Sequence, residues 1–554
     1  MTLPPQRSDA DRRQAGSVRS RAQALLSDLS LGLRYAWGLP RFLRNPTSLA
    51  EARSALPHRF EQRSAVFLEF MHRAVYLQPF SPYRALLAES GCEWGDLAHL
   101  VQRDGVEGAM GELFRRGVFV TVDEFKGRRP LRRGRLAMEL RPERFRNSLA
   151  VAHVWGRTSG SSGPGTPTAI DFAWLRERAI NSILLLDARE GGGMAHATWG
   201  TPGGGLGNLR TAAMGLAQER WFWNLDPIAD RLHPRHRWAY LALRLGCAWA
   251  RYPLPRPELV PYGNPRPILE WISSTLRSRR RPNLFAFVSP ALRLCQVAAE
   301  AGLDLTGARF TVTGEPLTPA RLAVFRRVGA EAVLTYGSME AGGDIGESCL
   351  RPSAPDDVHV LHDLYALVQP GPSSTGLPER ALLVSTLRST SPYVFMNVSL
   401  GDQAELTHRT CGCPLESLGW TSHLHSIRSY EKLTAGGMTL LDADVIRVLE
   451  EELPSRFGGG PIDYQLVEDE GPDGSARVRL LIHSRVGPLD ERKVVDLVLG
   501  TIGRGSGAAR VLALNWRSAG ILQAERRPPL TTANGKVLHL LRTRQSPPVS
   551  NATR

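Results

Sequence analysis

Lysine is so rare in this 554-residue chain that each lysine calls for a chemical explanation. Only four of the 69 basic residues are lysine, and the others are arginine. A compact ammonium and a planar guanidinium differ chemically, so a lysine in such a sequence indicates a position that arginine cannot serve. Lys536, at the end of Thr-Thr-Ala-Asn-Gly-Lys, is therefore a candidate for neutralising negative charge in a reaction. The alternative is an ordinary solvated lysine.

A loop rich in glycine and hydroxyl side chains is a second candidate. Glycine lets backbone amides approach an anion, and serine and threonine hydroxyls donate to phosphate oxygens. The loop contains Thr158, Ser159, Gly160, Ser161, Ser162 and Gly163, and it continues as Pro-Gly-Thr-Pro-Thr. It has neither the Gly-Lys-Ser/Thr ending of a Walker loop nor a dinucleotide-binding fingerprint. It is interpreted as a phosphate-binding loop, with a flexible Ser/Gly linker as the alternative.

The segment 308–337 has the pattern that would position further polar residues at strand ends. ARFTVTG predicts a strand, Thr318-Pro319 a helix start, and AEAVLTYG a second strand. This βαβ order implies a parallel sheet. Gly314-Glu315-Pro316 and Tyr336-Gly337-Ser338-Met339-Glu340 close the two strands. Ligands of parallel sheets bind outside these carboxyl ends, so both segments are candidate binding sites.

The predicted organisation is a large α/β domain followed by a smaller α+β domain. We expect a basic N-terminal arm over residues 1–47, the large domain over 48–427, the small domain over 428–545 and a tail over 546–554. Residues 49–114 are predicted to be helical because apolar residues recur at helical spacing. Residues 25–43 are amphipathic, which fits a helix packed on its own domain or, alternatively, one resting on a membrane surface.

Composition excludes several protein classes. Hydrophobic residues make up 42% and charged residues 22%, as in ordinary globular proteins. The formal charge of +15 comes from arginines spread along the chain, which resembles a coding bias, so nucleic-acid binding is not expected. Six cysteines in so long a chain do not predict a disulfide framework. Without a secretory signal or a long apolar run, we expect a cytoplasmic protein with no integral membrane association.

Taken together, five segments resemble the adenylate-forming superfamily in their order and spacing. They are the Ser/Thr/Gly loop, Gly314-Glu315-Pro316, the segment from Tyr336 to Glu340, Gly401-Asp402 and the segment ending in Lys536. The sequence is most similar to the phenylacetate:CoA ligase group and its capsule-biosynthesis relatives. The resemblance implies an adenylate-forming ligase fold with a mobile C-terminal lid. It also implies that ATP activates a carboxylic acid as an acyl-adenylate, which passes to coenzyme A or, alternatively, to a carrier protein or a protein cysteine.

The resemblance also implies a role for each matching residue. The ATP-binding residues would be Thr158, Ser159, Gly160, Ser161, Ser162, Gly163, Gly314, Glu315, Pro316, Tyr336, Gly337, Ser338, Asp402 and Arg428. Glu340 would hold Mg²⁺, and Lys536 would bridge the carboxylate and the α-phosphate, which makes these two the catalytic residues. Residues 191–223 would border the acid, and Trp199 indicates a flat or extended apolar substrate.

Some relatives in this group hold a structural zinc with a Cys, His, Cys-x-Cys arrangement. Cys349, His359, Cys411 and Cys413 match it, and three thiolates with one imidazole suit tetrahedral Zn²⁺. Three reduced cysteines with a surface histidine are the alternative.

Two segments depart from the family pattern. The phosphate-binding loop is longer and has no lysine, and the hinge reads Arg428-Ser429-Tyr430-Glu431, followed by Gly436-Gly437-Met438. A non-catalytic protein of the same fold, which binds a nucleotide or a partner, is therefore the alternative function.

Overall fold

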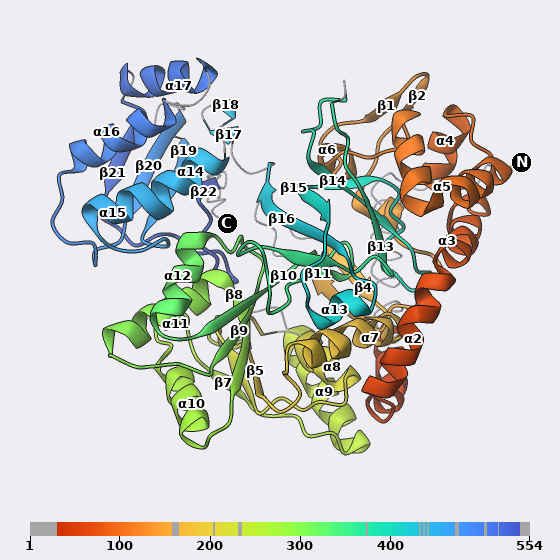
Figure 1. Cartoon of the computed structure of the whole chain (residues 1–554), viewed down its shortest axis with the longest axis horizontal. Helices are drawn as coiled ribbons and strands as arrows, with labels where there is room; N and C mark the ends of the chain where they lie inside the picture. Colours follow the sequence, from red (N-terminus) through yellow and green to blue (C-terminus); the bar gives the residue numbers. More distant parts are fainter. Residues whose placement is uncertain are drawn as a thin grey trace, which may run out of the picture.

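Six parallel strands form one half of a 12-stranded sheet in the computed structural model (Figure 1). Across the sheet they are β7 (Pro257–Leu259), β6 (Arg220–Trp223), β5 (Ala195–Gly200), β8 (Pro282–Phe287), β9 (Arg309–Thr313) and β10 (Glu331–Ser338). From β5 the chain first adds strands on one side and then, from β8, on the other. The strand order thus reverses between β5 and β8, and in open α/β sheets ligands bind at such a reversal, outside the carboxyl ends.

The structure describes residues 30–157, 166–202, 205–230, 235–372, 375–430, 434–435, 438–439, 442–470, 476–503, 507–518 and 520–542. Helices that pack on or between the parallel strands are α7 (Phe172–Ala188), α8 (Leu206–Ala213), α9 (Arg235–Ala250), α10 (Arg266–Arg277), α11 (Val288–Glu300) and α12 (Pro319–Arg327). Among these residues, no helix combines the length and apolar character needed to cross a bilayer.

The predicted βαβ unit is confirmed. Strand β9 pairs in parallel with β10, and α12 connects them. Thr318 is the N-cap of α12, because its hydroxyl accepts from the backbone N–H of Arg321 at 3.2 Å. The ring of Phe325 is fully buried against Phe310 of β9, with 5.3 Å between the centroids. Local capping and an apolar stripe are therefore sufficient to specify this unit.

The other half of the sheet is antiparallel. Beyond β10 it continues with β11 (Gly343–Glu347), β12 (Val358–Val360), β16 (Ser422–Ser429), β15 (Val398–His408), β14 (Ala381–Thr386) and β13 (Tyr365–Val368). A separate hairpin pairs β3 (Val154–Arg157) with β4 (Pro167–Ile170), and the short α13 (Pro414–Ser417) lies between β15 and β16.

The predicted helical segment near the N-terminus is also confirmed, and it covers the antiparallel half (Figure 1). Its elements are α2 (Leu49–Glu61), α3 (Arg63–Met71), the π-helical turn η1 (His72–Tyr76), α4 (Pro82–Glu89) and α5 (Trp94–Arg115). After it come α6 (Val122–Phe125), β1 (Leu131–Arg133), β2 (Leu136–Met138) and η2 (Pro142–Phe145). The buried amide of Asn397, just before β15, donates to the carbonyls of Met110 and Val118 at 2.7 and 3.1 Å. These bonds join the helices to the sheet, although the paired residues are 287 and 279 positions apart in the sequence.

Residues 30–43, although included in the predicted arm, form the packed helix that the amphipathic pattern of residues 25–43 indicates. They are helical, and Leu39 and Phe42 are buried in the core of the large domain. The ring of Phe42 stacks on Phe172 of α7, with 4.7 Å between centroids. The apolar face of this segment outweighs its basic composition, so this part of the chain packs on its own domain.

The C-terminal unit has a core of its own and lies at one side of the molecule (blue in Figure 1). Its sheet has the order β21 (Leu522–Glu525), β20 (Ala476–Ile482), β19 (Tyr464–Glu470) and β22 (Leu540–Arg542). Its helices are α14 (Asp442–Arg447), η3 (Val448–Glu452), α15 (Leu453–Phe457), α16 (Glu491–Ile502) and α17 (Gly507–Ser518), and β17 (Thr434–Ala435) pairs with β18 (Met438–Thr439) before them. The large sheet ends with Ser429 of β16, so Arg428 belongs to the large sheet.

Candidate active site and metal centre

Lys536 lies at the contact between the two domains. Lys536 is only 7% exposed, and its Nζ lies 4.8 Å from the ring centroid of Phe287, the last residue of β8. Gly314 follows β9, and a Cβ placed on it would lie 2.8 Å from the same Nζ. The structure therefore brings Lys536 and Gly314 together at the carboxyl ends of β8 and β9.

The segment 531–537, here called the lysine loop, forms hydrogen bonds with residues that follow β5, β6 and β8 of the large sheet. Thr201, after β5, donates its hydroxyl to Oδ1 of Asn534 at 2.6 Å. Asn224, after β6, donates to the carbonyl of Ala533 at 3.0 Å. The loop thus sits where the strand order reverses, which is the ligand-binding position of this sheet type.

A third fastening joins the lysine loop to α11. The backbone N–H of Val537 donates to the hydroxyl of Ser289 at 3.1 Å. Gly535 has a φ of +73°, and a Cβ there would lie 2.4 Å from the ring of Tyr262, so glycine is required by both conformation and contact. Thr201, Asn224 and Ser289 were not identified from the sequence, although their places after strands were the signal that could have found them.

The carboxylate of Glu315 is used inside the protein. It accepts from the backbone N–H of Ser289 at 2.9 Å and from the Ser289 hydroxyl, at the start of α11. The carbonyl of Pro316 accepts from Arg321 at 3.1 Å. The Glu315 carboxylate and the Pro316 carbonyl are therefore already paired within the protein, and Gly314 is the residue of this segment that lies against Lys536.

Tyr336 and Asp402 lie side by side, although three strands separate β10 from β15 in the sheet order. The Tyr336 hydroxyl donates to a carboxylate oxygen of Asp402 at 3.2 Å. Burial, together with the Asp402 charge, raises the pKa of Tyr336 well above its usual value, so this hydroxyl stays a donor. Two residues predicted to contact adenine and ribose are therefore neighbours.

Glu340 has a carboxyl group that is short of positive charge. Burial raises the pKa of Glu340, and the nearby Asp402 charge adds to this effect, while Lys126 and a hydrogen bond from Ser338 oppose it. A divalent cation would supply the missing charge, and a hard carboxylate oxygen suits Mg²⁺.

Gly337 has a different explanation, because a Cβ there would lie 2.2 Å from the carbonyl oxygen of Gly343. The close approach of β11 is what requires that glycine.

The predicted phosphate-binding residues Thr158, Ser159, Gly160, Ser161, Ser162 and Gly163 lie outside the described residues. The strands on either side are paired, with Arg157 opposite Pro167. A Cβ on Gly156 would lie 2.4 Å from the end of the Met339 side chain. The hairpin that leads to the loop is therefore beside Ser338 and Glu340.

Arg428 is held in β16 by Asp356, to which it donates at 2.8 Å. It lies opposite Gln403 of β15, next to Asp402.

The predicted acid-pocket residue Trp199 is buried beneath Tyr262, with 4.9 Å between the ring centroids, and its indole N–H donates to the carbonyl of Val260 at 2.8 Å. Tyr262 therefore separates Trp199 from the lysine loop.

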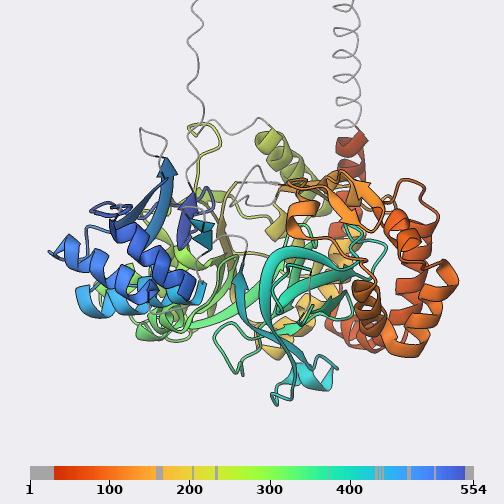
Figure 2. The ribbon, with the colours of Figure 1, turned by 90° about the horizontal axis from the view of Figure 1, so that it is seen from above.

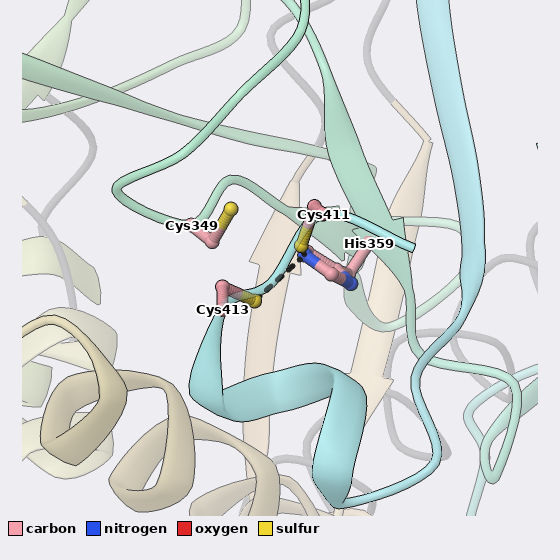
Figure 3. A group of neighbouring side chains, drawn as sticks. All are labelled: Cys349, His359, Cys411 and Cys413. Atoms are coloured by element: carbon pink, nitrogen blue, oxygen red, sulfur yellow. Dashed lines mark hydrogen bonds between the residues drawn. The ribbon is translucent and has the colours of Figure 1, made fainter. Parts of the chain in front are cut away.

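The four predicted zinc ligands converge at a second centre, on the antiparallel half of the sheet (Figure 3). Their ligand atoms all lie within 4.8 Å of one another. Nε2 of His359 is 3.6 Å from the sulfur of Cys411 and 3.4 Å from that of Cys413. Cys349 follows β11, His359 lies in β12, and the other two cysteines precede α13. This donor set and geometry fit a tetrahedral site with four protein ligands.

The surroundings prepare His359 to be a ligand. Its Nδ1 lies 2.6 Å from the carbonyl oxygen of Trp420, so Nδ1 carries the proton and Nε2 faces the thiols. Burial, aided by the neighbouring His423, lowers the pKa of His359 to about 4, which keeps the ring neutral. The carboxylate of Glu416 accepts from the N–H groups of Cys411 and Gly412 and shapes the Cys-x-Cys turn.

Comparison with known proteins gives matches only among solved structures. No family model and no curated protein matches the chain. A 2-hydroxyisobutyryl-CoA ligase in the postadenylation state is similar over 90% of this chain and 91% of its own, with 16% identity and a TM-score of 0.48. The amide bond synthetase McbA from Marinactinospora thermotolerans is similar over 91% of this chain and 98% of its own, with 14% identity and a TM-score of 0.40.

A third similar structure is the O-succinylbenzoate coenzyme A synthetase MenE from Bacillus subtilis, in complex with ATP and magnesium. It is similar over 71% of this chain and 70% of its own, with 13% identity and a TM-score of 0.39. By its own topology, the chain is a two-domain α/β protein with the large and small domains that the sequence predicted.

Proposed function

We propose that this protein uses ATP to activate a carboxylic acid as an acyl-adenylate and then transfers the acyl group to a thiol, which we take to be coenzyme A. One observation carries the proposal. A rare lysine from the small domain, Lys536, lies almost buried at the strand-order reversal of the large sheet, next to Gly314. A cation placed there suits a reaction between anions.

In the first step, a carboxylate oxygen attacks the α-phosphorus of ATP and pyrophosphate leaves. Both reactants are anions, so the transition state requires a preorganised positive charge. Lys536 supplies this charge, because its ammonium lies over the Phe287 ring and is largely shielded from water. The low exposure strengthens its interaction with the developing negative charge.

Other residues of the site would hold the nucleotide. Asp402, next to Tyr336, would accept hydrogen bonds from the ribose hydroxyls, and Tyr336 and Gly314 would border the adenine. Glu340 would hold Mg²⁺, which supplies charge neutralisation at the phosphates when it is bound. The paired strands β3 and β4 would present the hydroxyl-rich loop to the β- and γ-phosphates, since they lie beside Met339.

In the second step, a thiolate would attack the acyl carbonyl and AMP would leave. The lysine loop lies against the strand ends of the large sheet while Thr201 binds Asn534. We propose that the small domain turns away between the steps and opens a route for the thiol. Release would also break the buried contacts of Glu450 with Thr318 and Arg321, which join η3 to α12.

The test is pyrophosphate exchange into ATP with a panel of aryl, fatty and amino acids, followed by acyl-thioester formation with coenzyme A. The active acid should support exchange in the parent and in Lys493→Ala, a control whose side chain is 77% exposed. Lys536→Ala should lower exchange by about 10²- to 10³-fold. Nucleotide binding without exchange for any acid would favour the non-catalytic alternative, and equal exchange in both lysine variants would refute the role of Lys536.

We also propose that Cys349, His359, Cys411 and Cys413 hold a structural Zn²⁺. The support is the convergence of four ligand atoms of suitable chemistry. Four protein ligands leave no open coordination position, so the metal would stabilise this part of the sheet and take no part in either transfer step.

A further inference from the structure

Two neighbouring helices carry an unusual concentration of exposed apolar side chains. They are the helix of residues 30–43 and α9. In the described part of the chain, six of the sixteen exposed large apolar residues lie on these two helices. The six are Leu33, Trp37, Trp238, Leu241, Leu245 and Trp249. Trp37 is 81% exposed and Trp238 is 70% exposed, so these rings contribute nothing to the core.

The exposed residues form one face on each helix. On α9, positions 238, 241, 245 and 249 are three or four apart and share a face, while Leu243 and Cys247 are buried on the other. Leu33 and Trp37, four apart, do the same on the first helix, where Leu39 is buried. Each helix therefore has two apolar faces, one buried in the core and one in contact with solvent.

The two helices lie against each other. A Cβ on Gly246 of α9 would lie 2.3 Å from the side chain of Leu39, which shows how tightly they pack. The guanidinium of Arg44 donates to the carbonyl of Trp249 at 3.0 Å and lies 6.0 Å from its ring centroid. Figure 2 shows both helices, one red and one yellow-green, along the same side of the molecule. The exposed residues of the two helices, which meet where Arg44 contacts Trp249, are here together called the Trp/Arg face.

The charge on this surface has a single sign. Residues 30–44 and 235–251 contain seven arginines and no aspartate or glutamate. The exposed arginines are Arg34, Arg41, Arg44, Arg244 and Arg251. Within the described ranges, none of these five has a carboxylate within ion-pairing distance, whereas arginines such as Arg53, Arg63, Arg133, Arg178 and Arg309 are paired.

We infer that the Trp/Arg face binds an anionic lipid bilayer surface, with the two helices lying in the plane of the interface. Tryptophan and arginine prefer the headgroup region, and leucine enters the acyl boundary beneath it. Arginines without acidic partners complement anionic headgroups. A second copy of this chain would bring arginine against arginine, and a nucleic acid would leave the leucines in water, so a membrane surface fits both properties best.

The test is flotation of the full-length protein with vesicles of phosphatidylcholine, with or without phosphatidylglycerol. We expect binding that requires phosphatidylglycerol and weakens as salt is added. Trp37→Ser with Trp238→Ser should lower binding roughly tenfold or more. Arg34→Ser with Arg41→Ser should lower it by roughly 25-fold, since each arginine near an anionic surface contributes roughly fivefold. Both pairs are exposed, so nucleotide binding and the unfolding midpoint should stay at the parent values.

The matched control is Phe80→Ser, which removes an aromatic ring that is 85% exposed elsewhere on the molecule. It should float like the parent. No flotation with anionic vesicles, equal flotation with neutral ones, or an equal loss in the control would each overturn the inference. Dimerisation abolished by Trp37→Ser, or stronger binding to single-stranded oligonucleotides than to vesicles, would assign the face to another partner and would also overturn it.

Discussion

The hydroxyl of Thr201 donates to Oδ1 of Asn534 across 2.6 Å and joins residues that are 333 positions apart in the sequence. Thr201 directly follows β5 of the large domain, and Asn534 belongs to the loop that carries Lys536. The bond can form only while the small domain is docked on the sheet. It therefore marks the arrangement in which the lysine reaches the crevice.

Thr201→Val should slow adenylation by about two- to tenfold, because a hydrogen bond between neutral groups contributes about 0.5 to 1.5 kcal/mol. The affinity for ATP should not change, since Thr201 acts on the loop and not on the nucleotide. Exchange rates and equilibrium ATP titration measure the two effects. Thr306→Val, which changes an exposed loop, is the control. An adenylation rate equal to that of the parent would show that this bond does not position the loop.

Gly314→Ala should lower adenylation by about 10²-fold, a loss typical of a reacting group displaced by about 1 Å. The new methyl group would lie 2.8 Å from both Nζ of Lys536 and the Phe287 ring, and φ at this position is +79°. Gly487→Ala is the matched control, because nothing lies within 4 Å of its added Cβ. Steady-state exchange of both variants measures the difference, and parent-like exchange in Gly314→Ala would rule out the lysine position described above.

Glu450→Gln should destabilise the docked arrangement at neutral pH by about 3 kcal/mol, because it leaves the buried Arg321 with only the more distant counter-charge of Glu315, 3.8 Å away. The side chains of Glu450 and Arg321 are at most 1% exposed, and their atoms are 2.7 Å apart. Chemical unfolding of the full chain measures the change. Glu69→Gln, which breaks an exposed pair with Arg73, should cost about 0.5 kcal/mol or less.

The same pair predicts a pH dependence. Burial acts to raise the pKa of Glu450, but the Arg321 charge and the His539 hydrogen bond outweigh it and hold the pKa at about 2. An unfolded glutamate has a pKa of about 4.3. The stabilisation is therefore complete above about pH 4.3 and is lost as the pH falls towards about 2. Stability should fall more steeply over this window in the parent than in Glu450→Gln, and parallel curves would contradict the assignment.

Cys411→Ser should remove the metal and lower the unfolding midpoint, because metal binding at a structural site is coupled to folding. Protein purified without chelators should carry about one zinc per chain, measured by elemental analysis. Cys247→Ala is the control, since Cys247 is buried away from the cluster. Zinc-free parent protein would reject the site, and it would leave the nucleotide site unaffected.

The parts predicted well from the sequence are those specified by local signals. The βαβ unit follows from a capping threonine, a proline in the first turn and an apolar stripe, all within 30 residues. The convergence of Cys349, His359, Cys411 and Cys413 was predicted from the resemblance to relatives that hold a structural zinc with this arrangement. Residues 30–43 lie within the predicted arm, but the amphipathic pattern of residues 25–43 favoured a helix packed on its own domain, and the burial of Leu39 and Phe42 agrees with that helix.

Features that depend on distant pairing could not be predicted. The reversal between β5 and β8 arises from the order in which strands join the sheet, for which no residue has a signature. Thr201 and Ser289 are ordinary residue types that acquire importance only when the lysine loop arrives. The sequence predicts where Glu315 lies, at the end of a strand. It does not predict that the carboxylate accepts a hydrogen bond from the backbone N–H of Ser289.

The bonds from Asn397 to Met110 and Val118 also have a consequence for the order in which the protein is made. Residue 118 leaves the ribosome 279 residues before residue 397. At roughly 5 to 20 residues per second, this delay is on the order of 10 to 60 s. During this time the N-terminal helices lack the strand that satisfies their last carbonyl groups, and their apolar face has no sheet to cover. The contact between these helices and the sheet therefore forms only after the antiparallel half of the sheet has been translated.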